Sequence, residues 1–196
     1  MGVLGGSFNP AHDGHVHISL LALKHLHLDE VWWMVSPQNP LKPQAGMAPF
    51  EERFASAEAL ARHPDIRVTD IELHMRTRYT HDTLVTLKAC FPRVDFVWIM
   101  GADNLVQMSR WQRWTKIFNL VPIAIFDRAP YSFNALAGKA AQAFSRFQWR
   151  PRDALKLVEA RPPAWIFFHS RLYPGSATRI RGRRANLVRT NAREGH

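Results

Sequence analysis

Short apolar runs alternate with helix-like patterns along almost the whole chain, and this alternation constrains the possible fold more than any other feature. The apolar runs with the character of buried strands are 3–4, 31–35, 66–68, 71–73, 96–100, 121–126 and 165–168. The helix-like patterns are 16–28, 50–62, 80–90, a short one ending at 117–120, 134–144, and one from 176 onward. Strands that alternate with helices favour a parallel sheet covered on both faces. We therefore predict an α/β fold, with a doubly wound parallel sheet of about five to six strands and helices on both faces.

Length, cysteine content and the lack of long apolar segments predict a single-domain protein in a reducing compartment. The 196 residues fit one domain over 1–196, and no linker or internal repeat interrupts the pattern. The lone Cys90 excludes an intramolecular disulfide. We see neither a signal peptide nor an apolar run of roughly 18 residues, the length that a membrane span needs. We therefore expect a cytoplasmic protein with no membrane partner.

The charge balance favours a polyanionic partner. The net charge is +10, from 26 Lys and Arg against 16 Asp and Glu, and six arginines lie between Arg179 and Arg193. Nucleic acid and a phosphorylated small molecule would both fit this balance. We expect no nucleic-acid partner, because helix-turn-helix, RNA-binding aromatic and zinc-finger patterns are all missing. A basic nucleic-acid-binding module remains the alternative from a different functional class.

Polar signals follow the predicted strands at the points where those strands end. These segments are 5–15, 36–42, 101–111 and 176–181. In open sheets of this Rossmann-like type, ligands bind beyond the carboxyl ends of the strands. The four segments are therefore predicted to meet around one ligand site.

The first of these segments, GGSFNPAHDGH, has the composition of a phosphate-binding turn. It matches neither the G-x-G-x-x-G fingerprint nor the Walker loop. Gly5 and Gly6 leave room for a ligand close to the backbone, and Pro10 restricts the backbone conformation of the loop. His12 and His15, three residues apart, would project from one side of a first helical turn, where N–H groups and the helix dipole favour an anion. The pair is also compatible with a metal site, although neither an H-E-x-x-H motif nor cysteine ligands support one.

This segment resembles the signature of the nucleotidyltransferase superfamily, and the wider chain is similar to the bacterial nicotinate-nucleotide adenylyltransferases. The resemblance extends from Gly5 to Arg181. The further matching segments are SPQNPLK at 36–42, YTHDTL at 79–84, GADN at 101–104, Trp111, and SATRIR at 176–181. The first and last segments define the superfamily, and the middle ones indicate a nicotinate substrate. The last segment departs mildly, because Gly175 and Ala177 replace the expected Ile and the frequent Ser.

The resemblance implies adenylyl transfer from ATP to nicotinate mononucleotide, giving deamido-NAD and pyrophosphate by direct in-line attack on the α-phosphate. The implied catalytic residues are His12, His15 and Arg181. The implied ATP-binding residues are Gly5, Gly6, Ser7, Phe8, His12, Gly14, His15, Gly101, Asp103, Ser176, Thr178 and Arg181. The implied residues for the mononucleotide are Asn39, Lys42, Tyr79, Thr80, Trp111 and Gln112.

Within this resemblance, Trp111 would lie against the nicotinate ring, and the amides of Tyr79 and Thr80 would receive its carboxylate. Asp103 would accept hydrogen bonds from a ribose, with a helix N-cap as its alternative role. Mg²⁺ is expected on the ATP phosphates. No metal site made by the protein is expected, because magnesium is bound largely by substrate phosphates and water. An oligomer is possible.

Other nucleotidyltransferases with the same signature are the nearest alternatives. A phosphopantetheine or nicotinamide mononucleotide adenylyltransferase, or a cytidylyltransferase, would share the first and last segments. The phosphopantetheine and cytidylyltransferase enzymes are not expected to share 79–84 or Trp111. A non-catalytic nucleotide sensor is a further alternative, which the presence of both histidines and Arg181 disfavours.

Overall fold

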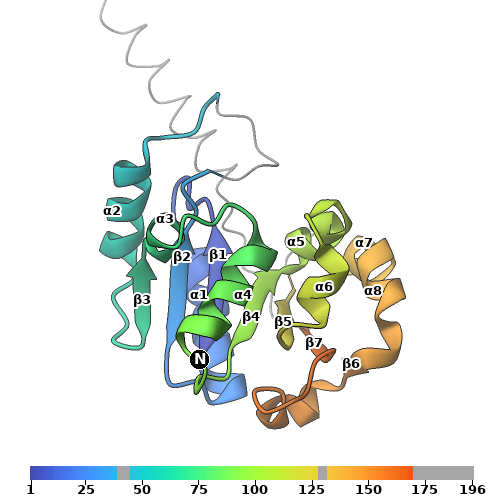
Figure 1. Ribbon diagram of the computed structural model, residues 1–196. Helices are drawn as coiled ribbons and strands as arrows, with labels where there is room; N and C mark the ends of the chain where they lie inside the picture. The colour runs from blue at the N-terminus through green and yellow to red at the C-terminus, as the bar shows by residue number, and fades with distance from the viewer. Residues whose placement is uncertain (39–44, 128–131, 170–196) are drawn as a thin grey trace, which may run out of the picture.

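A computed structural model describes residues 1–38, 45–127 and 132–169 of the chain (Figure 1). Seven strands of the described residues form one sheet in the order β3-β2-β1-β4-β5-β7-β6. The strands are β1 (Gly2–Gly6), β2 (Val31–Val35), β3 (Ile66–Thr69), β4 (Val97–Gly101), β5 (Ile123–Phe126), β6 (Gln148–Trp149) and β7 (Trp165–Phe168). Every neighbouring pair is parallel. The predicted parallel α/β fold is thereby confirmed.

Alternate residues of each strand point to opposite faces of the sheet, and each face has its own hydrophobic core. In β4, Trp98 and Met100 belong to one cluster, which includes side chains of α4, α5, α6 and α8. Ile99 belongs to the other cluster, with side chains of α1, α2 and η3. The predicted helices on both faces are confirmed.

The helices have bounds close to those predicted along the first half of the chain. The α-helices are α1 (Asp13–Leu26), α2 (Phe50–Leu60), α3 (Ile71–His74), α4 (Thr80–Cys90), α5 (Ala102–Gln107), α6 (Trp114–Phe118), α7 (Ser132–Leu136) and α8 (Lys139–Ala143). The 3-10 helices are η1 (Met108–Arg110), η2 (Ser145–Phe147) and η3 (Pro151–Lys156). None of the helices in the described part of the chain has the length and apolar character needed to cross a membrane.

The structure corrects the prediction at three places. The run 71–73 is not a strand piece but part of α3, because the chain turns at Asp70, where the Ile71 amide donates to Thr69 Oγ1 at 3.2 Å. The predicted helix 134–144 is broken by Gly138, which caps α8. The sheet has seven strands rather than five to six, because the two-residue edge strand β6 carries no apolar run.

The strand order places a topological switch point between β1 and β4. The chain moves from β1 outward through β2 to β3, and then returns to β4 on the other side of β1. The carboxyl ends of β1 and β4, with the loops that follow them, therefore flank the crevice in which sheets of this type bind ligands. In Figure 1 these ends point toward the top of the view, away from the N-terminus.

Candidate active site

Two histidines close the first turn of α1 in a reciprocal capping arrangement. His12 is the N-cap residue, and its Nδ1 accepts the backbone N–H of Gly14 at 3.1 Å. In return, His15 Nδ1 accepts the backbone N–H of His12 at 3.1 Å. The two rings stack with their centroids 3.9 Å apart. The pair predicted from the sequence is therefore one rigid unit, built by imidazoles where Ser and Glu usually form the capping box.

This capping fixes the tautomer of both imidazoles. A ring nitrogen that accepts an N–H carries no proton, so each neutral ring carries its proton on Nε2. Both Nε2 atoms are therefore hydrogen-bond donors, attached to the helix turn whose dipole favours an anion. Two donors on stacked rings at a helix N-terminus are suited to phosphate oxygens.

Aromatic side chains pack against the His15 ring of the histidine pair. The Phe8 ring, 2% exposed, lies 4.6 Å from the His15 ring and 5.2 Å from the Trp33 ring, measured between centroids. Trp33 in turn donates its indole N–H to Ser19 Oγ at 2.8 Å, and this hydroxyl donates to the His15 carbonyl. The imidazole of His15 thus packs against the Phe8 and Trp33 rings, which leave it little freedom to rotate.

The end of β1 contains a close backbone approach, and the loop between β1 and α1 contains a buried hydroxyl. Ser7 is 4% exposed, and its Oγ has no hydrogen-bond partner within the described residues. A Cβ on Gly5 would lie 2.4 Å from Cη2 of Trp98, so this glycine admits the Trp98 indole rather than a ligand. At Gly6 the nearest side-chain atom would be 3.4 Å away, an ordinary contact. A buried hydroxyl that has no partner within the described residues, in the loop that leads to the histidine pair, is the kind of group that a bound ligand satisfies.

The Trp98 indole connects this loop to the predicted nicotinate-binding residues. Trp111, half-buried at the end of η1, meets Trp98 edge to face at 6.2 Å between ring centroids. Gln112, the next residue, is exposed. Arg113 Nη1 then contacts Asp82 Oδ1 in the first turn of α4 at 3.1 Å. The structure therefore brings the Trp111 loop beside both the β1 loop and the start of α4.

The start of α4, where a carboxylate is predicted to bind, has no capping bond from its N-cap side chain. Tyr79 is the N-cap residue of α4, and its side chain makes no capping hydrogen bond. The first amides of this 11-residue helix therefore receive no bond from the N-cap side chain. At the end of β4, Gly101 is the N-cap residue of α5 and Asp103 lies within its first turn. Asp103 is thus not the helix cap that the alternative interpretation required.

Other predicted site residues lie outside the described residues. These are Asn39, Lys42, Ser176, Thr178 and Arg181. Their predicted roles remain predictions. The described members of the predicted set converge on the carboxyl ends of β1 and β4 and on the start of α4.

Two buried charged residues near this site, Arg53 and Glu72, are not among the residues predicted from the sequence. Thr83 Oγ1 donates to Glu72 Oε1 at 2.9 Å. Burial raises the pKa of Glu72, and hydrogen bonds from the Thr83 and Ser36 hydroxyls act in the opposite direction. Arg53 has a detectable signal, because it stands three residues after Phe50 and so falls on the apolar stripe of α2.

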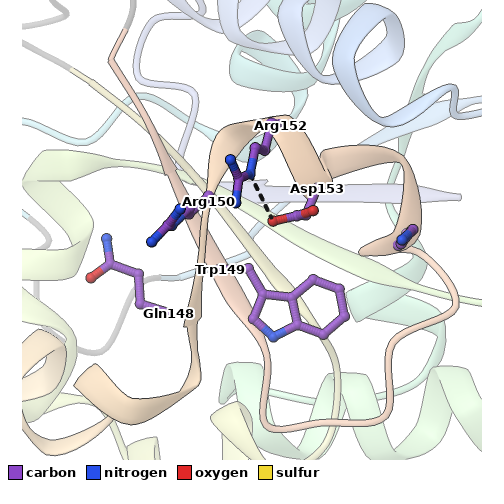
Figure 2. A pocket seen from close by; sticks show the side chains of 6 residues that line it. Gln148, Trp149, Arg150, Arg152 and Asp153 are labelled. Atoms are coloured by element: carbon purple, nitrogen blue, oxygen red, sulfur yellow. Dashed lines mark ion pairs between the residues drawn. The ribbon is translucent and has the colours of Figure 1, made fainter.

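A cavity of about 410 Å³ lies elsewhere, at the far edge of the sheet (Figure 2). Its lining residues are Gln148, Trp149, Arg150, Arg152, Asp153 and Lys156. Arg152 Nε faces Asp153 Oδ2 at 3.9 Å, the dashed line in Figure 2. No predicted site residue lines this cavity, and its strand β6 is an edge strand, whereas the histidines follow the interior strand β1. We therefore place the candidate active site at the histidine pair.

The described residues contain no group of three or more His, Cys, Asp or Glu side chains placed to hold a metal ion. The two imidazoles also use Nδ1 as acceptors of backbone N–H groups.

Comparisons with known proteins show the family to which the chain belongs. The sequence model of the cytidylyltransferase-like family matches residues 3–183. A probable nicotinate-nucleotide adenylyltransferase of Parvibaculum lavamentivorans is 50% identical over 183 residues, which cover 93% of this chain and 91% of the relative. One from Cereibacter sphaeroides, with the same name, is 49% identical over 181 residues, covering 92% of this chain and 96% of the relative.

Among solved structures, the nicotinic acid mononucleotide adenylyltransferase of Plasmodium falciparum complexed with NaAD aligns with a TM-score of 0.69 at 17% identity. The alignment covers 92% of this chain and 82% of that one. The same enzyme complexed with APC aligns with a TM-score of 0.67 at 16% identity, covering 92% of this chain and 81% of that one. At this identity the likeness shows the fold.

Proposed function

The chain belongs to the cytidylyltransferase-like family, and we propose on that basis that it is a nicotinate-nucleotide adenylyltransferase of NAD biosynthesis. It transfers the adenylyl group of ATP to nicotinate mononucleotide, giving deamido-NAD and pyrophosphate. The observation that carries the proposal is the stacked His12–His15 pair at the start of α1, in a chain about half identical to relatives with this name. Two fixed donors at a helix N-terminus match a reaction in which phosphate oxygens gain charge.

The reaction is a single displacement at the α-phosphorus of ATP. A phosphate oxygen of nicotinate mononucleotide forms the new P–O bond, the bond to the bridging oxygen of the β-phosphate breaks, and pyrophosphate leaves with the electron pair. No covalent enzyme intermediate is needed, so catalysis consists of positioning and charge stabilisation. The Nε2–H groups of His12 and His15 donate to the phosphate oxygens, and each such donor contributes on the order of 100- to 1000-fold in rate.

We assign the β- and γ-phosphates to Ser176, Thr178 and Arg181, with Arg181 as the charge partner. We also assign a phosphate contact to Lys42, in the segment that follows β2 in the sequence. Mg²⁺ bound by the ATP phosphates neutralises part of their charge, and it requires few protein ligands because magnesium keeps much of its water. The Ser7 hydroxyl, buried and unpaired within the described residues, is satisfied by the bound nucleotide.

Recognition of the second substrate uses the other end of the crevice. The amides of Tyr79 and Thr80 receive the nicotinate carboxylate at the N-terminus of α4, and the Trp111 indole covers the pyridine ring. Asp82 and Arg113 support this arrangement, since their contact at 3.1 Å joins the two segments. A neutral carboxamide gains less from a helix N-terminus than a carboxylate does, which favours nicotinate over nicotinamide.

A substrate panel tests the proposal. Purified protein with Mg-ATP receives nicotinate mononucleotide, nicotinamide mononucleotide or phosphopantetheine in separate reactions, and pyrophosphate release is followed. We expect fastest turnover with nicotinate mononucleotide and its loss in a His15→Ala control, which excludes a contaminating enzyme. Turnover with phosphopantetheine alone would refute the substrate assignment, and salt-sensitive nucleic-acid binding without turnover would support the nucleic-acid alternative.

A further inference from the structure

The guanidinium of Arg53 joins three separate segments of the chain beside the active site. Arg53 is 2% exposed on the inner side of α2. Its Nη1 donates to the carbonyl of Ser7 at 2.6 Å and to that of Ser36 at 2.8 Å. Its Nη2 donates to the Pro37 carbonyl at 2.9 Å, and its Nε to the Ala48 carbonyl at 3.0 Å. One buried side chain therefore fixes the loop after β1, the loop after β2 and the segment that enters α2.

The contact with Ser7 reaches the histidine pair through one residue. Phe8, the next residue, has a φ of 45°, a left-handed conformation that is unfavourable for a phenylalanine. A conformation of this kind persists when its neighbours hold it, and Arg53 holds the carbonyl directly before it. Since the Phe8 ring lies 4.6 Å from the His15 ring, a shift of Phe8 would move the support of His15.

A second contact strengthens the same connection. The Asn9 side chain, in the loop after β1, donates from Nδ2 to the Gly46 carbonyl at 3.0 Å. Its Oδ1 accepts the Ala48 amide at 3.3 Å. Arg53 therefore binds the carbonyl of Ala48, and Asn9 binds the amide of the same residue. The loop after β1 is thus tied to the entry of α2 at two points.

The chemistry of these contacts requires a guanidinium. The acceptors are four backbone carbonyls, and no carboxylate among the described residues forms an ion pair with Arg53. Burial lowers the pKa of Arg53, so the carbonyl contacts have to offset a cost that a solvent-exposed arginine does not have. A lysine ammonium carries the same charge but lacks the planar fork that spans several acceptors in fixed directions.

We propose that Arg53 is a positioning residue for adenylyl transfer, which fixes the Ser7–Phe8 segment and through it the orientation of the His15 imidazole. The same guanidinium sets the distance between this segment and the loop after β2. The inference rests on the proposed function for the reaction that it serves, although the geometry that it describes is independent of the substrate.

The test compares Arg53→Lys and Arg53→Gln with a matched control, Ala57→Gly. Ala57 is fully buried one turn further along α2, so its replacement destabilises the same helix without touching the loop carbonyls. Assays are run well below the melting temperature of each protein, with the folded fraction checked by circular dichroism. We expect kcat to fall about 10- to 100-fold in both Arg53 variants with smaller changes in KM, because misplacement of reacting groups by about 1 Å costs on this order.

A spectroscopic readout accompanies the kinetics. Proteins with ¹⁵N-labelled histidine report which ring nitrogen carries the proton, and wild-type His12 and His15 should both be protonated on Nε2 only. In the Arg53 variants we expect His15 to show a mixture of tautomers, while Ala57→Gly keeps the wild-type pattern. A role limited to fold stability would leave this signal unchanged at a temperature where the protein is folded.

Several outcomes separate the alternatives. Arg53→Lys with wild-type kcat would overturn the proposal, since charge alone would then suffice. Ala57→Gly with an equal loss of kcat would also overturn it. Should Arg53→Gln fail to fold, Arg53→Lys alone decides. The kcat of each variant is compared with the wild-type kcat, using whichever acceptor substrate the wild type turns over. The tautomer signal requires no turnover. An error in the proposed substrate would therefore leave this test of Arg53 valid.

Discussion

The capping and catalytic roles of His12 can be separated by mutation. His12→Asn keeps a side-chain acceptor for the Gly14 amide, because asparagine is a favoured N-cap residue. It removes the Nε2–H donor that we assign to the phosphates. His12→Ala removes both the acceptor and the donor. The two variants should therefore differ in stability and resemble each other in activity.

The magnitudes follow from the contacts of His12. Loss of the cap costs about 1 kcal/mol in a typical helix, within a range of about 0.5–2 kcal/mol. The ring is 4% exposed and stacked at 3.9 Å on His15, so both replacements also lose packing. A domain of this size loses about 2–4 °C of melting temperature per kcal/mol. We expect His12→Ala to melt about 2–4 °C below His12→Asn, and both to lose about 100- to 1000-fold in kcat.

Thermal unfolding and pyrophosphate release measure the two quantities in the same preparations. Equal melting temperatures for the two variants would show that the Gly14–His12 hydrogen bond does not stabilise α1. A His12→Asn protein with near wild-type kcat would show that the imidazole donor is not needed, and the catalytic assignment would then be wrong.

Three further predictions follow from single contacts. Glu72→Gln should remove a pH dependence of the free energy of unfolding. Because burial raises the pKa of Glu72, the wild-type free energy of unfolding falls as pH rises from the ordinary glutamate range through that raised pKa. Urea unfolding across this range should show the difference between the two proteins changing with pH, and a constant difference would contradict the argument. Trp111→Ala should raise KM for nicotinate mononucleotide about tenfold, corresponding to about 1.4 kcal/mol, and leave KM for ATP unchanged; an equal rise for both substrates would count against its contact with the pyridine ring. Gly5→Ala places a methyl group 2.4 Å from Trp98 and should lower the free energy of unfolding, measured in urea, by about 1–3 kcal/mol. Gly6→Ala, whose nearest atom would be 3.4 Å away, should lower it far less. Equal losses of stability in the two variants would show that the Trp98 indole moves freely.

The fold and the histidine pair were predictable from the sequence because their signals are local. Buried parallel strands are continuous apolar runs, as in 31–35 and 97–101, and alternation with helices determines their arrangement. The edge strand β6 was missed since two residues outside an apolar run give no periodic signal. The run 71–73 was wrongly predicted as a strand, because three residues cannot distinguish a strand from one helical turn.

The support of the histidine pair was not predictable, because it depends on contacts between segments far apart in sequence. Arg53 is 46 residues from Ser7, and its acceptors are backbone carbonyls, which every residue type possesses. No spacing rule can therefore identify them. What the sequence does contain is a charged residue on the apolar stripe of a helix, and such a residue is expected to be buried only when paired or hydrogen-bonded. Such an arginine indicates that several main-chain acceptors meet nearby, and in an α/β sheet main-chain acceptors meet where loops turn above the strands. The position of Arg53 within α2 is thus informative about the active site even though α2 contributes no residue to the predicted chemistry.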